Sequence, residues 1–121
     1  MLYAILCYDS EAVLGGMTAQ EDGELMGRLE AVNRRLAAAG KLGPSLRLKP
    51  TAMAATVRGG EVTDGPFAET KEQLLGFWIV DCATREEAVE AARQLECEKK
   101  TGALEVRPVG WSDLGPGRGV A

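Results

Sequence analysis

One apolar stripe dominates the first third of the sequence and predicts an amphipathic helix over residues 19–39. Its members recur at the i, i+4, i+7 and i+11 spacing of a single helix face: Leu25, Leu29, Val32 and Leu36. Thr18 and Glu21 precede it at the spacing of a capping box, in which each side chain satisfies a free amide of the first turn. Gly40 follows as a C-terminal cap. A helix of this kind needs a sheet or a second helix to cover its apolar face.

A second helix is predicted over residues 85–97 by the same kind of start. Thr84 and Glu87 repeat the capping spacing. The stripe that follows is made mostly of small residues: Ala88, Ala91, Ala92 and Leu95. Small side chains allow a helix to pack closely, so this one is expected to lie directly on a sheet.

Apolar runs between and around these helices predict strands. Residues 2–8, 74–81 and 104–107 are short apolar or alternating segments, and residues 42–64 carry the turn signals of a β-region. Within that region Gly59 and Gly60 predict a two-residue hairpin turn, because both accept positive φ. The order is βαββαβ with an extra hairpin. It indicates an α+β, ferredoxin-like fold: an antiparallel sheet with two helices on one face.

The segment Phe77-Trp78-Ile79-Val80 presents apolar side chains to both faces of that sheet. The helices cover only one face, and a bare apolar face favours association. A second copy of the same face is the simplest cover. The sequence therefore predicts a homodimer that joins through the open sheet face.

Charge and composition exclude several classes of function. The net charge is −4, with acidic and basic residues interspersed, whereas a nucleic-acid-binding face needs clustered Lys and Arg. No apolar run approaches the ~20 residues that cross a bilayer, so no membrane segment is expected. The start of the chain lacks the basic region of a secretory signal. These features favour a cytoplasmic protein.

The cysteines and the absence of His also bear on the compartment and on the kind of site that the protein can form. Cys7, Cys82 and Cys97 form no C-x-x-C pair and are expected to be free thiols in a reducing compartment. The chain has no His, which removes the commonest metal ligand and the usual base for a nucleophilic Cys. No metal or other cofactor is therefore predicted.

The segment Thr-Asp-Gly-Pro-Phe before the apolar strand has two interpretations. In the first, Asp64 accepts backbone hydrogen bonds in an Asx turn, with Gly65 and Pro66 shaping the bend and Phe67 entering the core or an interface. In the second, Asp64 lies partly desolvated beside a pocket and transfers protons. Both remain open at this level.

The second interpretation requires groups that stabilise a developing oxyanion. Arg47 and Lys71 are the candidate cations, and Tyr8 is a candidate neutral donor. Each also has a structural role available, since Lys71 lies among acidic residues and Tyr8 ends the first strand. Asp9 lies at the same strand end, where loop capping is its expected role.

Three segments together resemble the YCII-related family, in its DGPF branch: TDGPFAETKEQLLGF, LRLKPTAMAATVR and LEVRPV. The likeness covers residues 1–110 and leaves residues 111–121 as a Gly- and Pro-rich tail. It implies a dimeric α-β barrel of ferredoxin-like domains. It also implies a pocket in which Asp64 acts as acid-base residue. Around such a pocket we expect ligand binding by the three candidates above, Tyr8, Arg47 and Lys71, and by the rest of the motif, Gly65, Pro66 and Phe67.

This chain departs from the family pattern at two places. Members often carry a His in the first long helix, and the matching position here is Leu29. The family also tends to show two glycines where this chain has Leu75 and Gly76. The missing His excludes a His-Asp mechanism and leaves open whether the protein is an enzyme.

Two functions are compatible with these observations. One is a cofactor-free dimer that binds a small organic molecule and catalyses proton transfer of the isomerase or lyase type through Asp64. The alternative is a non-catalytic binding or regulatory module linked to extracytoplasmic-function sigma factors, an association that the resemblance implies.

Overall fold

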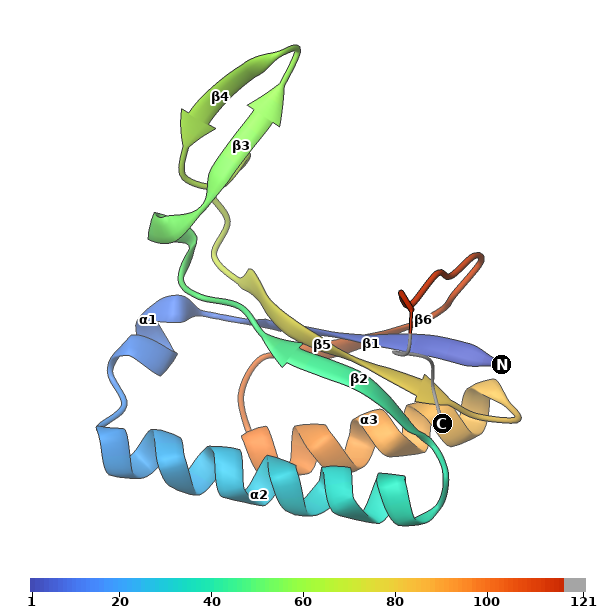
Figure 1. Ribbon diagram of the computed structural model, residues 1–121. Helices are drawn as coiled ribbons and strands as arrows, with labels where there is room; N and C mark the ends of the chain where they lie inside the picture. The colour runs from blue at the N-terminus through green and yellow to red at the C-terminus, as the bar shows by residue number, and fades with distance from the viewer. Residues whose placement is uncertain (117–121) are drawn as a thin grey trace.

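A four-stranded antiparallel sheet carries its long helices on one face (Figure 1). The computed structural model describes residues 1–116. The sheet order is β2-β5-β1-β6, and a separate hairpin is formed by β3 and β4. The strands are β1 (Leu2–Asp9), β2 (Leu42–Arg47), β3 (Ala55–Arg58), β4 (Glu61–Asp64), β5 (Gln73–Asp81) and β6 (Ala103–Pro108). This α+β arrangement is consistent with the ferredoxin-like prediction.

The two predicted helices are confirmed. Helix α2 (Ala19–Ala38) begins with the complete capping box of Thr18 and Glu21. Helix α3 (Arg85–Lys99) begins with Thr84 as its N-cap and runs beyond the predicted end at Cys97. A short helix that was not predicted, α1 (Glu11–Gly15), links β1 to α2. Within residues 1–116 no helix is long and apolar enough to cross a membrane.

The core lies between the helices and one face of the sheet. Alternate residues of β1 and β5 point into it, among them Ile5 and Val80, which are fully buried. The stripe of α2 and the alanines of α3 close it from the other side. Register places the remaining side chains of the central strands β1 and β5, and Leu46 of the edge strand β2, on the opposite face. We call this the open sheet face: Leu2, Ala4, Leu6, Tyr8, Leu46, Leu74, Phe77 and Ile79.

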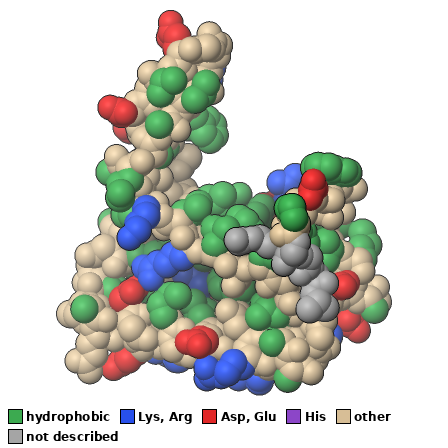
Figure 2. Space-filling view, viewed as in Figure 1, with side chains coloured by type: hydrophobic (Ala, Val, Ile, Leu, Met, Phe, Trp, Pro, Cys, Tyr) green, Lys and Arg blue, Asp and Glu red, His purple; other side chains and the backbone are tan. Residues whose placement is uncertain are grey.

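The β3–β4 hairpin stands away from this body (Figure 1). Gly59 and Gly60 form its turn with φ of 57° and 82°, which confirms the predicted hairpin. We call residues 51–67 the arm. Figure 2 shows hydrophobic side chains along it, and Val57, Val62 and Phe67 are 72%, 67% and 75% exposed. The arm therefore has an apolar surface that its own protomer leaves uncovered.

The base of the arm is fastened to α1. Glu11 accepts hydrogen bonds from the backbone amide of Thr51, at 2.8 Å, and from the Thr51 hydroxyl. The backbone amide of Glu11 in turn donates to the Gln73 side chain. These bonds fix where the arm leaves the body. At the other end of the chain, residues 111–116 form neither helix nor strand, and the rest of the predicted tail lies outside the described residues.

Candidate functional site

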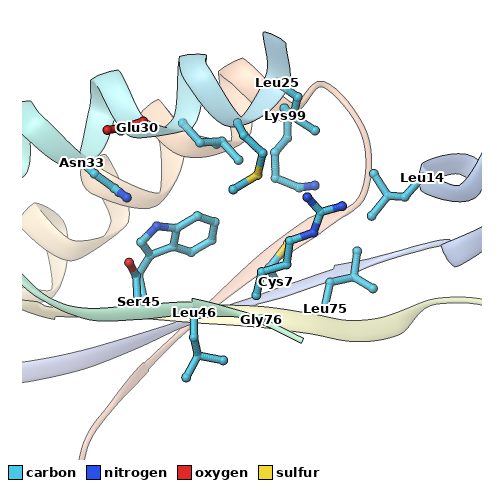
Figure 3. A pocket seen from close by; sticks show the side chains of 14 residues that line it. Cys7, Leu14, Leu25, Glu30, Asn33, Ser45, Leu46, Leu75, Gly76 and Lys99 are labelled. Carbon is cyan, nitrogen blue, oxygen red and sulfur yellow. The ribbon is translucent and has the colours of Figure 1, made fainter. Parts of the chain in front are cut away.

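A cavity of about 360 Å³ lies between α2 and the helix-covered face of the sheet. Every major element except β3, β4 and β6 contributes to its lining, and Figure 3 shows side chains entering it from the helices and from the sheet. The lining residues are Cys7, Leu14, Leu25, Met26, Leu29, Glu30, Asn33, Ser45, Leu46, Arg47, Leu75, Gly76, Trp78 and Lys99. Its volume is within the range of small-molecule sites.

The floor of the cavity depends on an irregularity in β5. Cys7 pairs with Gly76 but Tyr8 pairs with Leu74, so Leu75 is an extra residue in a β-bulge. The bulge turns the Leu75 side chain toward the cavity (Figure 3). At Gly76 the backbone of β2 comes so close that a Cβ would lie 2.2 Å from the Leu46 carbonyl oxygen. Glycine is therefore required there by close backbone approach.

A buried ion pair lies beside the cavity. The Lys99 ammonium is 3.5 Å from Asp9 Oδ2, and both side chains are 4% exposed. Asp9 is held more tightly by two other donors: the Ser10 amide on Oδ1 and the Thr101 hydroxyl on Oδ2, each at 2.7 Å. The expected loop capping by Asp9 is thus present, together with a lysine partner.

Cys7 lines the cavity next to this pair. Burial raises the pKa of its thiol, and the nearby Lys99 charge opposes that rise without cancelling it. Because a thiolate is the nucleophilic form, the raised pKa disfavours nucleophilic chemistry at Cys7. We therefore assign Cys7 a structural role in the lining of the cavity and no catalytic role.

Arg47 approaches the cavity from the edge strand β2. Its guanidinium donates two hydrogen bonds to Asp22, at 2.9 Å and 3.1 Å. The same bonds hold the pKa of the Asp22 carboxyl below its usual value and raise the pKa of Arg47. The pair is partly exposed, so it orients Arg47 more than it stabilises the fold.

The opposite part of the cavity is lined by Asn33 and Glu30 of α2 (Figure 3). Asn33 Oδ1 is buried and has no hydrogen-bond partner among the described residues. Buried polar atoms are nearly always paired, so an unpaired one that lines a cavity indicates a missing partner. A ligand with an N–H or O–H group would supply it.

The structure brings one of the predicted site residues to this cavity, namely Arg47. Tyr8 is on the open sheet face, where it lies opposite Leu74. Lys71 is exposed in the segment between the arm and β5 and forms no ion pair within the described residues. Leu29, at the position where the resemblance to the family implies a His, is buried and lines the cavity.

Asp64, Gly65, Pro66 and Phe67 belong to the arm and lie outside the cavity of their own protomer. Asp64 is exposed, and its carboxylate accepts no hydrogen bond within residues 1–116, so the Asx turn is not formed. Gly65 instead extends the hairpin: its amide donates to the Ala54 carbonyl, and its carbonyl accepts from the Thr56 hydroxyl. Its φ of 94° explains why glycine follows Asp64.

Four polar residues of the cavity were not predicted from the sequence: Glu30, Asn33, Ser45 and Lys99. Two of them left a signal. Lys99 lies four residues after Leu95, so it continues the buried stripe of α3 with a charged residue. Asn33 lies four residues after Leu29 in α2, so it places a polar side chain beside the buried stripe of that helix. A polar residue at such a position is a candidate for a site.

Comparison with known proteins yields two matches. A family model described as the YCII-related domain matches residues 1–110. An uncharacterized protein of Rhizobium meliloti (strain 1021) is 54% identical over 114 residues, which cover 90% of this chain and 92% of that protein.

Proposed function

The chain belongs to the YCII-related domain family, and from that premise we propose that it binds a small organic molecule in the cavity between α2 and the sheet. The observation that carries this proposal is an apolar cavity whose lining includes two residues with unused hydrogen-bonding capacity, Lys99 and Asn33. Protein interiors are otherwise packed without voids of this size, because empty space forfeits contacts. A bound ligand would supply the missing contacts.

Binding is tested with N-phenyl-1-naphthylamine, a neutral apolar probe that fluoresces out of water. We expect one probe per chain to bind, and Met26→Trp to weaken binding at least tenfold, because Met26 lines the cavity and is partly exposed. Val13→Trp is the matched control: it adds the same bulk to an exposed residue outside the lining. Equal affinity of both variants, or no binding by the unmodified protein, would contradict the proposal.

We further propose that the functional unit is a homodimer. Support comes from two uncovered apolar surfaces of one protomer: the open sheet face, centred on Phe77 and Leu46, and the arm, with Val57, Val62 and Phe67 exposed. A two-stranded hairpin is marginally stable by itself, so the arm needs a surface to lie on. A second copy covers both surfaces at once.

The dimer is tested by sedimentation equilibrium at micromolar concentration. We expect twice the chain mass for the unmodified protein. Phe77→Glu is expected to give the chain mass alone, because it places a charge at the centre of the proposed interface. Val13→Glu, which charges an exposed residue of α1, is the control and is expected to stay dimeric. A monomeric unmodified protein would refute the homodimer.

For the chemistry we propose proton transfer with Asp64 as the acid-base residue, which requires the arm of one protomer to reach the cavity of its partner. Gly65, Pro66, Phe67 and Lys71 would accompany it. Tyr8 lies on the open sheet face, across the sheet from the cavity, and has no part in this step. The support is the exposed, unbonded carboxylate on an arm that its own protomer does not cover.

Asp64→Asn tests this step. Because the carboxylate makes no hydrogen bond within the described residues, we expect the free energy of unfolding to change by less than about 0.5 kcal/mol. Probe binding is expected to persist, and turnover of a substrate found by screening is expected to be lost. A variant that turns over at the original rate rules out the acid-base role.

The alternative is a non-catalytic cytoplasmic module that recognises a metabolite or a protein such as an extracytoplasmic-function sigma factor. It is favoured by one specific observation: the cavity is lined by Leu29, and the chain has no His to work with Asp64. A protein that binds the probe but turns over no screened substrate, with or without Asp64, would support this alternative.

A further inference from the structure

The Lys99 ammonium is the most unusual charge in the molecule because it is buried and incompletely paired. It lies at the end of α3, lines the cavity, and is 4% exposed. An ammonium has three donors. Within the described residues the Lys99 ammonium donates a hydrogen bond to Asp9 Oδ2 at 3.5 Å, which is long for a hydrogen bond. The Cys7 sulfur, a weak acceptor, lies nearby.

Asp9 does not need Lys99 to satisfy its oxygens. The Ser10 amide and the Thr101 hydroxyl already donate to them at 2.7 Å. The ammonium is therefore held near a carboxylate that is otherwise satisfied, with donors left for the cavity. A buried cation in this condition gains most from a further acceptor, above all a charged one.

The charges around the cavity are not evenly distributed. Arg47 lines it from β2, and Lys99 enters beside Leu25 (Figure 3). Glu30 and Asn33 lie further along α2 (Figure 3). Since α2 rises about 1.5 Å per residue, the eight residues from Leu25 to Asn33 span about 12 Å. One end of the cavity thus has two cations, Arg47 and Lys99, whose paired carboxylates Asp22 and Asp9 are not part of the lining. The other end has an acidic residue and an amide oxygen without a partner among the described residues.

From this polarity we infer that the ligand is a small organic acid with an apolar body, its carboxylate on Lys99 and a hydroxyl or N–H group on Asn33. The inference rests on the proposed binding function and adds the class and orientation of the ligand. The apolar middle of the cavity, formed by Leu25, Leu29 and Trp78, accommodates the body. Glu30 disfavours the reverse orientation.

The wall residue Trp78 provides a direct reporter. The chain has two Trp, and Trp111 is 83% exposed in the described part of the C-terminal segment. In Trp111→Phe, indole fluorescence comes from Trp78 alone. Titration of this variant compares 4-phenylbutyrate with 4-phenyl-1-butanol, which has the same body and no charge. We expect the acid to bind at least tenfold more tightly.

Variants in the Trp111→Phe background assign the preference to Lys99. The double variant Asp9→Asn/Lys99→Met removes both charges without leaving Asp9 ionised and unpaired. It is expected to bind the acid at least tenfold more weakly and the alcohol unchanged. Lys49→Met is the control; it removes an exposed lysine outside the lining and is expected to keep the preference.

A second comparison tests the Asn33 end. Adding a para-hydroxyl to the ring of 4-phenylbutyrate is expected to tighten binding several-fold, and Asn33→Ala is expected to abolish that gain while the acid-over-alcohol preference persists. Loss of both effects together in Asn33→Ala would show a collapsed cavity and contradict the two-ended model.

The remaining outcomes separate this inference from the binding function. If the alcohol binds as tightly as the acid, or if neither binds while N-phenyl-1-naphthylamine does, the inference is overturned and the binding function stands. If the double variant keeps the preference for the acid, Lys99 is not the anion site and the inference is overturned. If N-phenyl-1-naphthylamine also fails to bind, the binding function falls with it.

Discussion

Gly76→Ala is expected to lower the free energy of unfolding by about 3 kcal/mol, the upper part of the range for overpacking. The added Cβ would lie 2.2 Å from the Leu46 carbonyl oxygen and 3.1 Å from the Arg47 Cα. Both are backbone atoms of β2, so no side chain can rotate to relieve the contact. Strand β2 must move away from β5, which breaks hydrogen bonds at the sheet edge and displaces Arg47 from the cavity.

Urea unfolding followed by far-ultraviolet circular dichroism measures this effect, at equal protein concentration because dimerisation would add to stability. Gly27→Ala is the matched control. Gly27 lies inside α2 with nothing within 4 Å of its added Cβ, so the same change is expected to raise stability by about 1 kcal/mol. If both variants behave alike, the close strand approach does not determine stability.

Lys99→Met is expected to cost about 3 kcal/mol of unfolding free energy, because it leaves Asp9 buried and ionised without a cation. The cost is at the lower end of the range for a broken buried pair, since the Ser10 amide and the Thr101 hydroxyl still donate to Asp9. The methionine keeps most of the volume of the lysine stem, so packing changes little.

A double-mutant cycle with Asp9→Asn isolates the charge effect. The Asp9→Asn/Lys99→Met variant is expected to recover most of the stability lost in Lys99→Met, because replacing both charges of a buried pair is often nearly neutral. Lys49→Met, on the surface, is expected to change stability by less than about 0.5 kcal/mol. If the two single effects simply add, Asp9 and Lys99 are not coupled.

The local part of the fold was predictable because it depends on neighbouring residues. The capping pairs and apolar stripes fixed α2 to within a residue, and Gly59-Gly60 identified the hairpin. The short helix α1 was missed, because its five residues make fewer than two helical turns and show no repeating apolar stripe. The position of the extra hairpin was not predicted, and only the tertiary structure shows that it leaves the body as an arm.

The candidate site was less predictable because it depends on contacts across the whole chain. Asp9 and Lys99 are separated by 90 positions and meet only when β1 and α3 pack together. The predicted end of the second helix at Cys97 placed Lys99 outside it. The composition of the TDGPF segment, in contrast, predicted a candidate site residue, Asp64. The segment lies on the arm and away from the cavity of its own protomer.

The position of β1 at the centre of the sheet has a consequence for synthesis on the ribosome. Its two hydrogen-bonded neighbours are β5 and β6, which begin at Gln73 and Ala103. Because β1 precedes both neighbours in the chain, its pairing is complete only after β6 has been synthesised. Such non-local pairing slows folding and prolongs the exposure of unpaired strand edges. Strand β1 thus acquires its second neighbour from the last strand of the sheet to be translated.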